Sequence, residues 1–79
     1  MAILIDNLSS QVTQVNLQKL FQAYGSVKQI WLPIDWKKNK TFAFAFVEML
    51  EKADEAAAIS DLKGLNWMGH QLQISEVSF

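Results

Sequence analysis

Four short stretches of the chain are rich in β-branched, aromatic and other apolar residues, and this pattern predicts four β-strands. They span residues 1–8, 26–34, 41–49 and 71–77. Pro33 lies near the end of the second stretch and indicates a strand at the edge of a sheet, because proline cannot donate a ladder hydrogen bond.

Two further stretches predict helices. Thr13 is a suitable N-cap for a helix that runs to Tyr24 with an apolar stripe at helical spacing. Asn16 stands where a full capping box has an acidic side chain, so we expect only the Thr13 half of that motif. A second helix is expected over about residues 53–63, followed by a turn at residues 65–69.

The order of these elements, βαββαβ, predicts an α+β fold. Such an order places two helices on one face of a four-stranded antiparallel sheet, which is the ferredoxin-like sandwich. With 79 residues, the chain is expected to form a single domain, 1–79.

The third strand has the strongest pattern in the sequence. With a period of two, one face collects Phe42, Phe44, Phe46 and Glu48, and the other collects Ala43, Ala45, Val47 and Met49. On pattern alone the phenylalanines belong in the core, because large apolar side chains are usually buried. Glu48 opposes that assignment, since a carboxylate buried without a partner is costly.

Two motifs resemble those of the RNA-recognition-motif family. Residues 42–49 lie on that family's octamer, which reads basic, Gly, aromatic, small, aromatic, aliphatic, any, aromatic, and residues 3–8 lie on its hexamer. Shorter phrases along the chain are similar to the small single-domain members from cyanobacteria and other bacteria. They fall at residues 20–21, 24–27, 44–49, 57–59 and 67–69.

The resemblance reverses the orientation that the pattern favours for the third strand. It implies that Ala43, Ala45 and Val47 lie under the helices. It also implies that Phe44 and Phe46 lie on the open sheet, where nucleotide bases and riboses pack.

Three positions depart from the family's motifs. Leu4 stands where the hexamer has an aromatic platform, Phe42 where the octamer has Arg or Lys, and Ala43 where it has Gly. A base stacked on an aromatic ring contributes roughly 1–3 kcal/mol, so a lost platform weakens binding. Trp31 compensates if it lies on the open face, and Phe42 itself can stack.

The net charge is −1 and the chain contains no arginine, but its lysines are unevenly distributed. Lys37, Lys38 and Lys40 follow the second strand in a polar hairpin loop and are candidate phosphate contacts. A solvated hairpin whose lysines only keep a sheet edge soluble explains them equally well. Gln73 on the last strand is a candidate hydrogen-bonding partner for base edges, although an ordinary polar surface position explains it equally well.

Two functions compete for the same sheet face. The first is single-stranded RNA binding, weak and of low sequence specificity. The alternative is a protein partner or a homodimer, which the acidic pI of 5.6 and Leu4 favour. Phe79 could fold across the face and mask it. A peptide-binding subclass of the fold has Arg-any-Phe where this chain reads 65–67 Leu-Asn-Trp, without the arginine.

Catalysis is not expected. The chain has no cysteine, and its single histidine, His70, has no Cys or second His with which to form a metal site. No glycine-rich phosphate loop is present, so we expect neither cofactor nor metal. No signal peptide or membrane-spanning stretch is recognised, and the absence of cysteine fits a reducing, cytoplasmic location.

Overall fold

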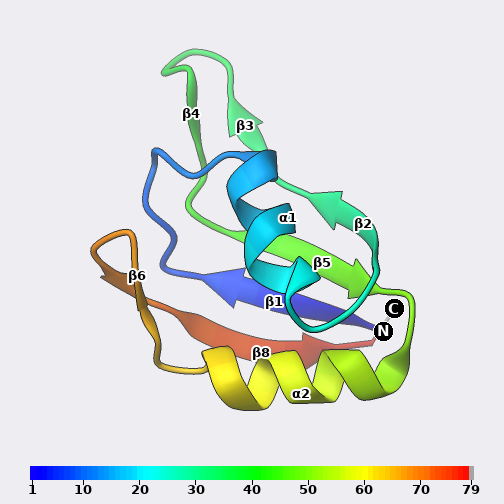
Figure 1. Cartoon of the computed structure of the whole chain (residues 1–79). Coiled ribbons are helices and arrows are strands. Elements are labelled where there is room, and N and C mark those ends of the chain that lie inside the picture. Colours follow the sequence, from blue (N-terminus) through cyan, green and yellow to red (C-terminus); the bar gives the residue numbers. More distant parts are fainter. Residues whose placement is uncertain (79) are drawn as a thin grey trace.

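Both helices lie on one face of a four-stranded sheet in the computed structural model, which describes residues 1–78 (Figure 1). The sheet order is β2-β5-β1-β8, and every neighbouring pair is antiparallel. The strands are β1 (Ala2–Asp6), β2 (Val27–Trp31), β5 (Ala45–Met49) and β8 (Gln73–Val77), and the helices are α1 (Gln14–Gln22) and α2 (Lys52–Leu62). The predicted ferredoxin-like α+β fold is therefore confirmed.

Two short hairpins project from this sandwich, at the predicted hairpin loop and at the predicted turn, but the sequence pattern did not predict the short paired strands that form them. The first pairs β3 (Ile34–Asp35) with β4 (Lys40–Thr41), and the second pairs β6 (Asn66–Trp67) with β7 (His70–Gln71). The predicted strands 26–34 and 41–49 are each interrupted, because β2 ends before Pro33 and β5 begins only at Ala45. In the second hairpin, Met68 and Gly69 both have positive φ, as a tight two-residue hairpin turn requires.

The core fills the space between the helices and the inner face of the sheet. Its strand residues include Ile3 and Ile5 of β1, Ala45 and Val47 of β5, and Ile74 of β8; its helix residues include Leu17, Phe21, Ala58 and Leu62. The pattern-only expectation that the phenylalanines are buried is therefore wrong. Ala45 and Val47 are fully buried, as the family resemblance implied.

Ala43 departs from that implication. Its φ of 68° lies in the left-handed region and it is only half-buried, so it precedes the strand and does not lie under the helices. The kink is held by hydrogen bonds on both sides of the residue. Its carbonyl accepts from the Leu8 amide at 2.9 Å, and its amide donates to the Thr41 hydroxyl at 3.1 Å. A left-handed conformation explains why the family's octamer has glycine at this position.

The start of α1 is more complete than the sequence indicated. The Thr13 hydroxyl accepts from the Asn16 amide at 3.1 Å, and the Asn16 side-chain oxygen accepts from the Thr13 amide at 2.9 Å. Asn16 thus performs the role usually taken by an acidic side chain, and the capping box is reciprocal.

Glu55 joins the end of β5 to α2 from inside the protein. It is 5% exposed, and its Oε2 accepts from the Met49 amide at 3.2 Å. Its place in the first turn of α2 also lets its charge interact favourably with the helix dipole. The hydrogen bond shows that it also fixes the strand-to-helix turn, because it satisfies a buried amide.

The left-handed Ala43 yields a stability prediction. Ala43→Gly should raise the free energy of unfolding by about 0.5–1 kcal/mol, because glycine adopts this conformation without a Cβ clash and that gain exceeds its extra chain entropy. Urea denaturation followed by circular dichroism measures the change. The control is Ala56→Gly on the exposed face of α2, which should lower stability by about 1 kcal/mol; a loss of stability in both variants would contradict the prediction.

Candidate functional site

Residues from four strands form a row across the open face of the sheet. Trp31 of β2 is the register partner of Phe46 of β5, and Phe46 is the partner of Leu4 of β1. Leu4 in turn is the partner of Ser75 of β8. We call Trp31, Phe46, Leu4 and Ser75 the cross-sheet row. Their immediate neighbours along each strand include the buried core residues, so the row faces away from the helices.

A β-bulge in β2 places Trp31 in this row. Val27 is paired with Met49 and Ile30 with Val47, and the register shifts between Val27 and Gln29. Val27 and Ile30 both pack against the core, although they are three residues apart. Strict alternation from Val27 would turn Trp31 inward, so the extra residue in the bulge is what directs its indole outward.

The aromatic side chains of the face are partly accessible. Trp31 is 38% exposed, and Phe44, Phe46 and Leu4 are half-buried. The Phe44 and Phe46 rings meet edge to face, with centroids 6.0 Å apart and planes at 85°. This edge-to-face geometry is favourable for an aromatic pair.

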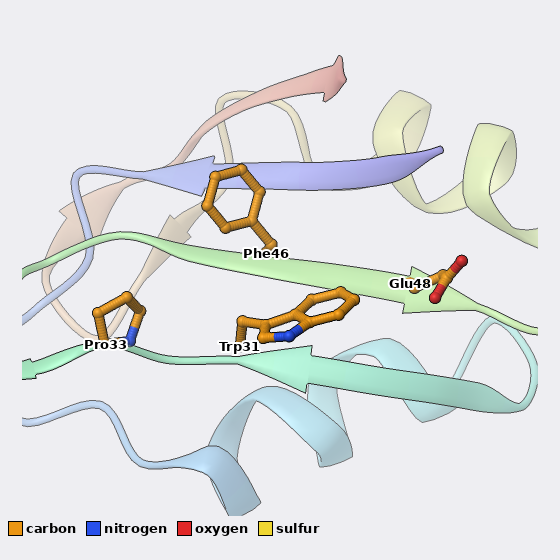
Figure 2. A pocket seen from close by; sticks show the side chains of 4 residues that line it. All are labelled: Trp31, Pro33, Phe46 and Glu48. Carbon is orange, nitrogen blue, oxygen red and sulfur yellow. The ribbon is translucent and has the colours of Figure 1, made fainter. Parts of the chain in front are cut away.

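A hollow of about 510 Å³ opens at the β2 end of the row and is lined by Trp31, Pro33, Phe46 and Glu48. Figure 2 shows the Phe46 ring on one side, the Trp31 indole along the floor and the Glu48 carboxylate beyond the far end of the indole. The volume lies within the roughly 300–1,000 Å³ typical of small-molecule sites. The wall of the hollow is thus almost wholly apolar, and the Glu48 carboxylate lies at its rim.

Glu48 and Pro33 were not among the predicted site residues. Strand alternation already placed Glu48 on the same face as Phe46, and the charge of Glu48 indicated that this face is open. Glu48 could therefore have been predicted as a residue of the site. Its Oε2 lies 4.0 Å from the Lys28 Nζ, which is a long and solvent-exposed pair. The sequence did not indicate that Pro33 lines the hollow, because its position there depends on the bend of the chain between β2 and β3.

Phe42 lies outside the cross-sheet row. It is 54% exposed and its amide donates to the Pro33 carbonyl at 3.2 Å. The left-handed Ala43 interrupts the alternation that was expected to align Phe42 with Phe44 and Phe46. Phe42 is therefore a surface aromatic at the base of the β3–β4 hairpin.

The three predicted lysines lie on that hairpin, which extends beyond the end of the sheet (Figure 1). Lys37, Lys38 and Lys40 are all exposed. Lys40 lines a second hollow that also involves the 10–14 segment before and at the start of α1. Among the described residues, the hollow at Trp31 and Phe46 is lined by none of the three lysines.

Polar side chains border the row at the β8 edge. Gln73 is exposed and is the register partner of Asp6, and Ser75 ends the row. These groups can form hydrogen bonds beside the aromatic platforms. The predicted position of Phe79 lies outside the described residues.

Within residues 1–78, no helix has the length and apolar character needed to cross a membrane, and no three acidic or histidine side chains gather as a metal site. Trp67, the aromatic residue in the turn that a peptide-binding subclass would use, packs against the core.

The chain is similar to proteins from cyanobacteria along almost its entire length. It is 45% identical over 76 residues to RbpD of Nostoc sp. strain PCC 7120, whose name provisionally describes it as RNA-binding; the match covers 96% of this chain and 81% of that protein. It is 41% identical over 76 residues to RbpA of Synechocystis sp. strain PCC 6803, covering 96% and 75% of the two chains.

Solved structures show the same fold. A crystal structure of RNA binding protein PG1 superposes with a TM-score of 0.90 at 31% identity and covers 98% of this chain and 93% of that one. A complex of the SXL-lethal protein with RNA superposes with a TM-score of 0.90 at 25% identity, covering 98% and 46%.

Residues 3–73 match the family described as the RNA recognition motif. The resemblance noted from the octamer and hexamer is therefore confirmed. The family binds RNA and is not enzymatic, in agreement with the prediction that this chain is not an enzyme. By its sequence, its sheet order and its aromatic open face, the chain belongs to the RNA recognition motif family.

Proposed function

We propose that this protein binds single-stranded RNA through the open face of its sheet, weakly and with low sequence specificity. The observation that carries the proposal is the pairing of Trp31 with Phe46 across two strands, with Phe44 edge-on beside them. Aromatic rings on an open sheet are platforms for unstacked bases. Support also comes from the relatives, one of which has been solved as a complex with RNA.

The low specificity follows from the chemistry of the platforms. Stacking tolerates any base, because every base has a π-face. Leu4 occupies the central position on β1, between Phe46 and Ser75, where the family's hexamer has an aromatic residue. The net charge of −1 and the absence of arginine reduce the attraction for phosphates. The proposed complex therefore depends on few platforms and few charges.

Binding of a protein partner or of a second copy to this face is less favoured than binding of RNA. The apolar part of the row is bordered by Asp6, Gln29, Glu48 and Gln73, and two copies placed face to face would bring carboxylates together at an apolar contact. Sedimentation velocity at high protein concentration tests this alternative. A concentration-dependent dimer that RNA does not dissociate would favour it.

The aromatic platforms give the first prediction for RNA. The double variant Phe44→Ala/Phe46→Ala should bind short RNAs at least tenfold more weakly, because each lost stacking contact costs roughly 1–3 kcal/mol. Fluorescence anisotropy at low salt measures the affinity. The control is Val15→Ala, which removes a side chain that is 58% exposed on α1. Unchanged affinity in the folded double variant would exclude this face as the binding site.

Restoring the missing platform should have the opposite effect. Leu4→Phe places a ring next to Phe46 in the cross-sheet row, so its RNA affinity should rise by about tenfold. The same anisotropy titration measures it. No gain in a variant that melts at the wild-type temperature would mean that bases do not reach β1.

The lysines on the hairpin should contact phosphates. If all three do so, replacing Lys37, Lys38 and Lys40 by Gln should reduce the slope of log affinity against log salt by about 2 in magnitude. The matched control replaces Lys19, Lys52 and Lys63, which lie on or beside the helices, and removes the same charge. Equal slopes for the two triple variants would indicate that the hairpin lysines are only solvated.

A further inference from the structure

Glu48 is the one charged residue among those that line the hollow on the open face of the sheet. Its side chain is 24% exposed and lines the hollow with Trp31, Pro33 and Phe46. In Figure 2 its carboxylate stands beyond the far end of the Trp31 indole, on the same side of the sheet as the Phe46 ring. A planar group that covers the indole next to Phe46 would therefore direct one edge toward this carboxylate.

The character of the hollow favours a neutral base over a phosphate. Apart from Glu48 its lining is formed by two aromatic rings and a proline. A phosphate here would meet a negative charge and flat apolar surfaces, whereas a base would stack on the rings. The Glu48 carboxylate lies at the rim of this apolar wall, where the edge of a stacked base would emerge.

A carboxylate selects among bases because it only accepts hydrogen bonds. The Watson–Crick edge of guanine has two adjacent donors, N1–H and the 2-amino group, which match the two carboxylate oxygens. Adenine and cytosine offer one amino group beside a ring nitrogen that is itself an acceptor. Uracil offers one N–H between two carbonyl oxygens, and these would repel the carboxylate.

Lys28 completes the pattern that guanine requires. Its Nζ lies 4.0 Å from the Glu48 Oε2, so a cationic donor stands beside the acceptor. Guanine has its O6 acceptor next to the N1–H donor, in the complementary order. The long separation leaves both groups able to turn toward a ligand, since exposed pairs at this distance are weakly bound to each other.

We propose that the hollow formed by Trp31, Pro33, Phe46 and Glu48 binds a guanine base, stacked on the indole with its Watson–Crick edge on the Glu48 carboxylate. This inference rests on the proposed RNA binding and adds one position that discriminates between bases on an otherwise sequence-tolerant face. Lys28 donates to O6 in this arrangement.

The test uses short adenosine oligonucleotides that carry one variable central nucleotide, with binding to the full chain measured by fluorescence anisotropy at fixed salt. Central guanosine should bind about tenfold more tightly than central uridine, because a bidentate contact discriminates by about that factor or more. Central inosine, which lacks only the 2-amino group, should fall between the two.

The decisive variant is Glu48→Gln, which keeps the shape of the side chain and removes its double acceptor. The ratio of guanosine to uridine affinity should then fall toward one, while Glu76→Gln, an exposed acid on β8 away from the hollow, should preserve the wild-type ratio. Thermal melting verifies that both variants are folded. Comparing ratios cancels the uniform gain in affinity that any lost negative charge produces.

The two proposals fail in different ways. Equal affinity for guanosine and uridine strands, or a guanosine preference that survives Glu48→Gln, would overturn the guanine site and leave RNA binding intact. Absence of binding to every strand, at low salt and high protein concentration, would overturn both.

Discussion

The packing of two helices against the small side of β5 is the constraint on which the rest of the structure depends. Ala45 and Val47 are fully buried, and their small side chains let the helices approach the sheet closely. Because side chains alternate along a strand, this burial directs Phe46 and Glu48 to the opposite face. The Phe46 ring therefore lies on the surface because its neighbours Ala45 and Val47 are packed in the core, and no separate interaction on the open face is needed to place it there.

Two backbone irregularities then determine which other aromatic residues share that face. The bulge in β2 changes the phase of the strand between Val27 and Ile30, so that both contribute to the core and Trp31 turns outward next to Phe46. The left-handed Ala43, just before β5, has the opposite effect. It breaks the alternation of side chains, so Phe42 does not share the face of Phe44 and Phe46. Together they leave Trp31, Phe44 and Phe46 as the aromatic residues of the open face.

The element order, the Thr13 cap and the sandwich architecture could be predicted from the sequence because each depends on local patterns. The charge of Glu48 also indicated the open face correctly, against the size of the phenylalanines. The hairpin loop with the three lysines and the turn at residues 65–69 were expected, but the short strand pairs beside them were not. The bulge and the left-handed Ala43 were not predictable, because a change of phase within a strand leaves its composition unchanged. The hollow at Trp31 depends on that phase, so its lining required the structure.

The open face therefore combines stacking surfaces with a border that is polar and partly acidic, and the basic hairpin lies at its end. The most direct test is an NMR titration of the isotope-labelled protein with a mixture of short RNAs. The Trp31 indole N–H and the amides around Phe46 and Leu4 should shift, while those on the outer faces of α1 and α2 should not. Shifts confined to the helical side, or no shifts at saturating RNA, would contradict binding at the sheet.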